Sequence, residues 1–249
     1  MEPPYKHATR FITSPISIPS PAYLVVGSCP GEDPKGRTFY TKGNYYLYDK
    51  EDISEKRDVD RSRYIEGNFT EFPVNSQLGK VFNETFDTVI FDNSVAKYLN
   101  GNAYPLKSLF MMVKPGGNLI IDSVNGLSVI NPIKIFDSSG IGREESLEES
   151  KDRVKNTFIA QIKEHLTPKI ENLEIKTFNE IISENPVANE VYGPLLSNEK
   201  LLKEKYISPD GECILITKSK AGSGGKRSIR KIKKRMSTRK IRSTKRSRK

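Results

Sequence analysis

Short, continuous apolar runs constrain the fold of this chain more than any other feature. The runs YLVV, FDTVIF, NLII and CILI contain little alternation of apolar and polar residues. Such runs are typical of strands that are buried on both faces of a parallel sheet. Strands are therefore predicted at Tyr23–Val26, Tyr45–Tyr48, Tyr64–Glu66, Thr85–Phe91, Asn118–Asp122, Leu173–Phe178 and Glu212–Thr217.

Helical patterns alternate with these strands. Apolar residues recur at helical spacing in Pro105–Val113 and Glu144–Leu166, and a shorter amphipathic stretch covers Asn198–Tyr206. The segment 177–200 is interpreted as a long irregular insert, and Asp137–Gly142 as a loop. The alternation predicts an α/β fold with a doubly wound, mostly parallel sheet, whose last two strands form an antiparallel hairpin at the C-terminal edge.

The positive charge of the chain lies at its C-terminus. The net charge is +10, yet 14 of the 41 basic residues and none of the acidic residues fall within Lys226–Lys249. Three regions follow: an extended proline-rich arm at 1–20, a globular domain at 21–220, and a flexible linker with a disordered basic tail at 221–249. A basic tail can bind the phosphates of nucleic acid, act as a nuclear import signal or only aid solubility.

Several classes of protein are disfavoured by composition. No apolar run approaches the roughly 18 residues that cross a bilayer, and the N-terminus lacks the pattern of a signal peptide. The two cysteines, Cys29 and Cys213, have no metal-ligand spacing around them, so neither a metal site nor a disulfide framework is expected. We expect an intracellular protein of the cytoplasm or nucleus, whose oligomeric state stays open.

Candidate binding residues follow the predicted strands. Gly27 and Gly31 flank Ser28 and Cys29 after the first apolar run, and glycine lets a backbone turn sharply and approach a ligand. Asp49 directly follows the second predicted strand, 22 residues beyond Gly27, where a carboxylate can accept hydrogen bonds from ribose hydroxyls. Asp92 and Asn93 follow the central strand, at the edge where ligands gather in open α/β sheets.

Five segments in this order resemble the Rossmann-like S-adenosylmethionine-dependent methyltransferases: VVGSCPG, YYLYDKED, YIEGNFTEFP, FDTVIFDNSVAKYL and LFMMVKPGGNLII. The resemblance covers about Tyr23–Asp122 and implies a Rossmann-like fold, S-adenosylmethionine as cofactor and methyl transfer as activity. It also implies that Asn68 meets the exocyclic amine of the adenine and that Phe69 covers a face of its ring. A catalytic base is not identified, and neither His7 nor His165 is assigned as one.

Three departures from the family pattern leave alternatives open. The position two residues before the first glycine is Val25 where the family usually has an acid, Cys29 replaces the middle glycine, and Asn68 replaces an acid. The chain is therefore an active methyltransferase of unknown acceptor associated with nucleic acid, an inactive relative that binds nucleic acid or a structural partner, or a glycan-modifying methyltransferase. Its tail is similar in composition to those of large DNA virus proteins, which implies a virion or virus factory.

Overall fold

The structure of the protein is a computed structural model. The predicted N-terminal arm up to residue 17, the predicted helix Asn198–Tyr206, and the linker with its basic tail lie outside the residues that it describes. The described residues are 18–27, 42–49, 60–69, 72–92, 102–122, 133–136, 142–197 and 211–220.

A seven-stranded mixed sheet forms the centre of the molecule, in the order β3-β2-β1-β4-β5-β9-β8. The first five strands pair in parallel, and β9 is antiparallel to β5 and to β8. This order confirms the predicted α/β, Rossmann-like sheet with its antiparallel C-terminal pair. The strands are β1 (Tyr23–Val26), β2 (Tyr45–Asp49), β3 (Tyr64–Glu66), β4 (Phe86–Phe91), β5 (Val113–Ile121), β8 (Ile170–Thr177) and β9 (Glu212–Lys218).

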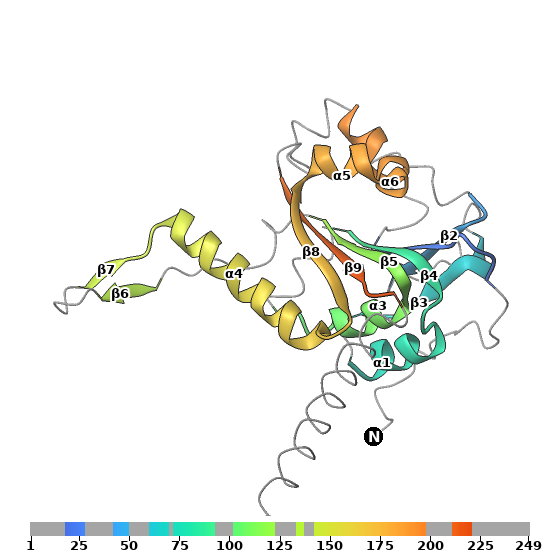
Figure 1. Ribbon diagram of the computed structural model, residues 1–249, viewed down its shortest axis with the longest axis horizontal. Helices are drawn as coiled ribbons and strands as arrows, with labels where there is room; N and C mark the ends of the chain where they lie inside the picture. The colour runs from blue at the N-terminus through green and yellow to red at the C-terminus, as the bar shows by residue number, and fades with distance from the viewer. Residues whose placement is uncertain are drawn as a thin grey trace, which may run out of the picture.

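Helices cover both faces of the sheet (Figure 1). On one face, α1 (Phe72–Val81), α3 (Leu106–Met112) and α4 (Leu147–Leu166) contribute buried side chains to a core with alternate residues of the strands. On the other face, α5 (Phe178–Glu184) and α6 (Pro186–Leu196) bury theirs against the remaining strand residues. This two-sided burial explains why the central strands are continuous apolar runs.

The described part of the predicted insert, 177–197, is helical and not irregular, so that prediction was wrong there. Thr177 begins α5 with a capping box, in which its hydroxyl accepts a hydrogen bond from Glu180 N–H and the Glu180 carboxylate accepts one from Thr177 N–H. Asn185 then caps α6, and Pro186 occupies the first position of that helix, where its missing N–H costs nothing. Local capping chemistry therefore divides this stretch into two helices.

A two-stranded hairpin precedes α4, where a loop and the start of a helix were predicted. Its strands are β6 (Lys134–Phe136) and β7 (Gly142–Glu144), and residues 137–141 lie outside the described part. Glu144 belongs to β7 because α4 begins only after Ser146, whose side chain forms a capping box with Glu149. In Figure 1 the hairpin lies at the far end of α4, away from the sheet.

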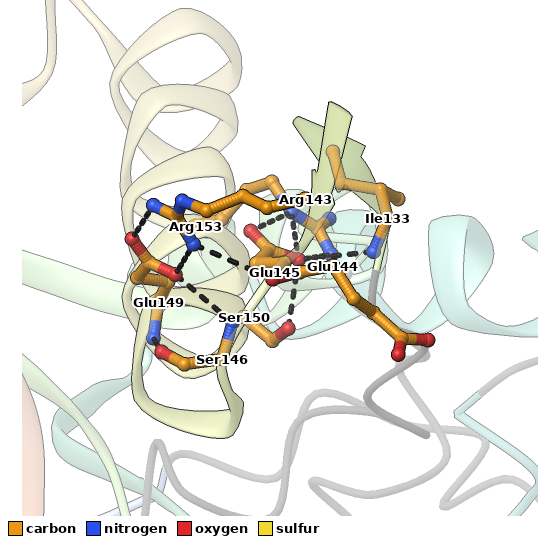
Figure 2. A network of polar contacts seen from close by, with 8 residues as sticks. All are labelled: Ile133, Arg143, Glu144, Glu145, Ser146, Glu149, Ser150 and Arg153. Carbon is orange, nitrogen blue, oxygen red and sulfur yellow. Dashed lines mark hydrogen bonds and ion pairs between the residues drawn. The ribbon is translucent and has the colours of Figure 1, made fainter. Parts of the chain in front are cut away.

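Buried polar contacts fasten this hairpin to α4 (Figure 2). Glu145 is 5% exposed and accepts hydrogen bonds from Arg153 Nε at 2.9 Å, from the Ser150 hydroxyl at 2.7 Å and from Ile133 N–H at 3.3 Å. Arg143 makes a second ion pair, with Glu149. The Arg153 guanidinium, above all, holds the pKa of the Glu145 carboxyl down at about 2, against the opposing effect of burial.

The segment Lys114–Gly117 bulges out of β5. Phe86 pairs with Val113 and Thr88 pairs with Asn118, so Asp87 alone faces four residues of the neighbouring strand. Lys114 Nζ donates to Asp87 Oδ2 at 2.8 Å, and a Cβ on Gly117 would lie 2.5 Å from the Asp87 carbonyl oxygen. Gly117 therefore has to be glycine because the backbone of β4 passes so close.

A buried lysine joins the last strand to α3. Lys218 is 2% exposed, and its Nζ donates to the carbonyl oxygen of Val113 at 2.6 Å and of Phe110 at 3.4 Å, at the C-terminal end of α3. The same ammonium group lies 3.3 Å from the Glu84 carboxylate. A cation at this place is favourable because the C-terminal end of a helix carries a partial negative charge.

We expect the stabilising effect of the Glu145 contacts to be lost at acid pH. The folded pKa of Glu145 lies below its unfolded value, so its stabilising effect is complete above about pH 4.5 and is lost as the pH falls toward 2. Glu145→Gln should therefore be less stable than the wild type at pH 7, and the difference should shrink below pH 4.5. Urea unfolding across that range measures it. Glu148→Gln changes an exposed carboxylate in the first turn of α4 and serves as control. A difference in stability between Glu145→Gln and the wild type that stays constant with pH would contradict the assignment.

Lys218→Met should lower the free energy of unfolding by about 1–3 kcal/mol, because it removes the charged donor 2.6 Å from the carbonyl oxygen of Val113. Lys80→Met changes an exposed lysine of α1 and should stay within about 0.5 kcal/mol of the wild type. Denaturant unfolding at neutral pH compares the two variants. Equal stabilities would show that the carbonyl contacts of Lys218 contribute nothing net.

Candidate functional site

The strand order creates one switch point in the sheet. From β1 the chain continues outward through β2 and β3 on one side, whereas β4 and β5 lie on the other side. In open α/β sheets the crevice at the carboxyl ends of the two central strands is the usual ligand site, because connections leave there in opposite directions. In this chain those central strands are β1 and β4.

Four backbone hydrogen bonds align the carboxyl ends of the parallel strands. Gly27 N–H donates to Tyr48 O at 2.8 Å, and Asp92 N–H donates to Val26 O at 3.1 Å. Gly67 N–H donates to Asp49 O at 2.8 Å, and Asp122 N–H donates to Phe91 O at 3.0 Å. The residues that follow or end the strands therefore form one row, about 5 Å apart from strand to strand. By strand register the row is Glu66, Asp49, Gly27, Asp92 and Asp122, and Gly67 lies one residue beyond it.

Gly27 has the conformation that the predicted glycine turn requires. Its φ is 83°, in the left-handed region, where a side chain is strained. The chain bends at Gly27, directly after β1, and the absence of a Cβ leaves the backbone open to a ligand. The predicted site residues Ser28, Cys29 and Gly31 lie outside the described residues, as does Asn93.

Buried carboxylates surround Gly27 on both sides. Asp49 is 8% exposed at the end of β2, and Asp92 is fully buried after β4. Leu47 and Ile90 pack against α5 and α6, and Asp49 and Asp92 come two residues after them on the same strands. Side chains two residues apart on a strand share a face, so both carboxylates lie on the side of the sheet that α5 and α6 cover. The structure thus brings together Gly27, Asp49 and Asp92, three of the predicted site residues.

A third buried carboxylate of the row was not predicted as a site residue. Asp122 is fully buried after β5, one strand beyond Asp92 and on the same side of the sheet. The sequence carried a signal for it, because Asp122 directly follows the apolar run NLII just as Asp92 follows FDTVIF. A polar residue at the end of a buried strand is a candidate at every strand of such a sheet, not only at the central one.

The predicted adenine segment follows β3 at the same edge. Asn68 is partly exposed there, one residue after Gly67. Phe69 is 8% exposed and packs edge-on against Phe91 of β4, with ring centroids 5.1 Å apart. The Phe69 ring is thus held by the core beneath the site.

The part of the chain that the structure describes contains neither a metal-binding cluster nor a membrane-spanning helix. No cluster of three or more His, Cys, Asp or Glu side chains able to hold a metal ion is present there. Among the described helices, none has both the length and the apolar character needed to span a bilayer. His165 packs edge-on against Tyr104 with ring centroids 5.5 Å apart, in the helical layer away from Gly27, and no catalytic role follows from its position.

Comparison with known proteins gave structural neighbours only. No family model and no curated protein matches the chain. The solved structures that match include the MycE methyltransferase of the mycinamycin pathway, bound to Mg and S-adenosylhomocysteine (TM-score 0.40, 16% identity, 83% of this chain). A second is an S-adenosylmethionine-dependent methyltransferase from Mesorhizobium loti (TM-score 0.39, 11% identity, 81% of this chain and 91% of the other). The chain spans about half of the MycE protein, 47% of its length.

Gly27→Ala should destabilise the protein by about 1–2 kcal/mol, because alanine is strained in the left-handed conformation. Gly43→Ala is the matched control: a Cβ at Gly43 meets nothing within 4 Å, and its φ is not in that region. Urea unfolding of both variants measures the difference. Equal stability of the two would mean that the turn after β1 does not need glycine.

Proposed function

We propose that the carboxyl edge of the sheet binds S-adenosylmethionine and that the chain is a methyltransferase. One observation carries the proposal: a left-handed glycine, Gly27, lies between two buried carboxylates, Asp49 and Asp92, at the switch point of the sheet. The five segments that resemble the methyltransferase family supply the same residues in the same order. When bound, the cofactor supplies an electrophilic methyl group on a positively charged sulfur.

The residues of the edge fit this cofactor in three ways. Asp49 offers two carboxylate oxygens, enough to accept from both ribose hydroxyls. Gly27 leaves space beside its backbone for the part of the cofactor that passes the turn. Asp92 and Asp122 add negative charge in a buried environment, where a nearby cation is stabilised far more than it would be in water.

The adenine would lie along the segment after β3. Asn68 has an amide that can accept from an exocyclic amine, and it is partly exposed at the same edge as Asp49. Phe69 keeps only 8% of its surface exposed, so in this proposal its edge rather than its face borders the base. The work of the chain is then to hold and orient the cofactor and to exclude water.

An inactive relative is the second candidate, and one observation favours it. Val25, two residues before Gly27, is fully buried in the core beside α5 and α6. An acid at that position would meet apolar neighbours, so this chain forms its core where the family usually carries a charged site residue. The module would then keep the fold and lose the cofactor.

Nucleic acid is the partner that the tail suggests. Lys226–Lys249 carries 14 basic residues and no acidic one. If about half of them met phosphates, log K would fall with log salt at a slope of about −6, without dependence on base sequence. The last described residues follow β9 to the amino edge of the sheet, opposite to Gly27, so a nucleic acid held by the tail would need the length of the tail to reach the site.

Calorimetric titration of S-adenosylhomocysteine into the full chain tests the cofactor site. We expect micromolar affinity, about −8 kcal/mol, and a loss of at least about tenfold in Asp49→Asn, which keeps the shape of the side chain but not its charge. Asp152→Asn alters an exposed carboxylate of α4 and should leave the affinity unchanged. Absence of binding to folded wild-type protein at millimolar ligand would overturn the cofactor proposal and support the inactive module.

A further inference from the structure

A polar row crosses the opposite, amino edge of the sheet. Thr88 of β4 pairs with Tyr23 of β1 on one side and with Asn118 of β5 on the other. The row continues through Tyr45 of β2 and Thr217 of β9, which pair with Tyr23 and Asn118 respectively. Five adjacent strands thus present a hydroxyl or an amide at the same level.

This row faces the layer of α5 and α6. Two residues further along their strands, Val25, Ile90 and Ile120 are buried in the core below these helices. Side chains two apart on a strand share a face, so Tyr23, Thr88 and Asn118 point to that side as well. Tyr23 and Tyr45 pack with the core on this side, but strands of a parallel sheet covered on both faces are normally apolar, so packing does not account for Thr88 and Asn118.

A cavity of about 400 Å³ lies over the middle of the row. Its floor includes Tyr23, Thr88 and Asn118, and the bulge Lys114–Gly117 forms one wall. The first residues of α6, Asn185–Val187, line another side. This volume is within the range of pockets that hold small molecules.

The side chains of the cavity keep hydrogen-bonding capacity for a ligand. Asn118 Oδ1 accepts from the Thr217 hydroxyl at 3.0 Å, which leaves the amide nitrogen of Asn118 as a donor. Asn185 Oδ1 accepts from the N–H groups of Val187 and Ala188, which leaves its amide nitrogen as a donor too. Thr88 is 5% exposed, and among the described residues its hydroxyl has no partner.

The charge of the cavity is balanced. Asp87 lines it beside Lys114, and the carboxyl Oδ2 accepts from Lys114 Nζ at 2.8 Å and from Ala22 N–H at 2.9 Å. Within the described part of the chain, Oδ1 of the same carboxylate keeps its capacity to accept. The N-terminus of α6 attracts no anion, because Pro186 has no N–H and Asn185 caps the next two. A neutral ligand suits this site better than an ion.

We propose that this cavity binds a neutral, hydroxylated ring of monosaccharide size. Each ring hydroxyl both donates and accepts, so it matches amide donors, the Thr88 hydroxyl and the free oxygen of Asp87 together. The ring of Tyr23, which packs on Tyr45 with centroids 5.1 Å apart, offers an apolar surface beside these polar groups. The ring can come from a glycoside or from the ribose of a nucleoside, and the site is separate from the carboxyl edge.

Titration of the full chain with methyl α-glucopyranoside and with uridine, followed by backbone amide NMR shifts, tests the proposal. We expect saturable shifts at Thr88, Gly117 and Asn118 with at least one probe at millimolar concentration, and the responding probe identifies the source of the ring. Thr88→Val keeps the shape of the side chain and should weaken binding about three- to tenfold. Thr85→Val makes the same change in the turn before β4, outside the cavity, and should have no effect.

The contrary results are equally distinct. No shift with either probe at about 50 mM would overturn the proposal, since even a site worth about 2 kcal/mol would then be populated. Shifts confined to Gly27, Asp49 and Asp92 would also overturn it, because the probe would then occupy the carboxyl edge. An unchanged affinity in Thr88→Val, together with shifts at the cavity, would remove the polar row as the cause and refute the site as described.

Discussion

Hydrogen bonding between β1 and its two parallel neighbours is the constraint on which the rest of the structure depends. The last residue of β1 in the paired ladder is Val26, and two further hydrogen bonds extend the pairing beyond it. Gly27 N–H donates to Tyr48 O of β2, and Asp92 N–H, after β4, donates to Val26 O. A shift of register by one residue would turn every side chain of β1 to the other face. The pairing therefore places the core residues Leu24 and Val26 and the turn at Gly27 in one step.

The two edges of the sheet solve different physical problems. At the carboxyl edge, the strands end together and leave buried carboxylates around a left-handed glycine. At the amino edge, the bulge Lys114–Gly117 opens β5 and the ion pair of Lys114 with Asp87 closes the gap that remains. The bulge matches the family resemblance in sequence, yet it lies at the edge away from Gly27, so its job in this chain is to shape the sheet.

The strands could be predicted from sequence because strands that are buried on both faces are continuous apolar runs. Tyr23–Val26 and Tyr64–Glu66 were predicted with the bounds that β1 and β3 have. The hairpin β6–β7 has no such apolar run, because its strand Gly142–Glu144 is short and exposed. The contacts of Glu145 with Arg153 and Ser150 hold it in place instead. The helices α5 and α6 were missed because Asn185 and Pro186 break the apolar pattern, although both residues are favourable at a helix start. Of the site, Gly27, Asp49 and Asp92 followed from their places after apolar runs. Asp122 follows the run NLII in the same way, and the register of β5 against β4 shows that it belongs to the same row.

Both proposed sites share one thermodynamic argument. A sheet covered by helices on both faces gains most from apolar side chains, and taking a polar or charged group out of water costs free energy that its partners have to offset. This chain nevertheless buries Asp49, Asp92 and Asp122 at one edge and Thr88 at the other. Local violations of this kind are expected where function, rather than stability, selects the residue. If Thr88→Val makes the protein more stable, the Thr88 hydroxyl does not contribute to the stability of the fold. Ligand binding in the adjoining cavity then accounts for this residue better than folding does.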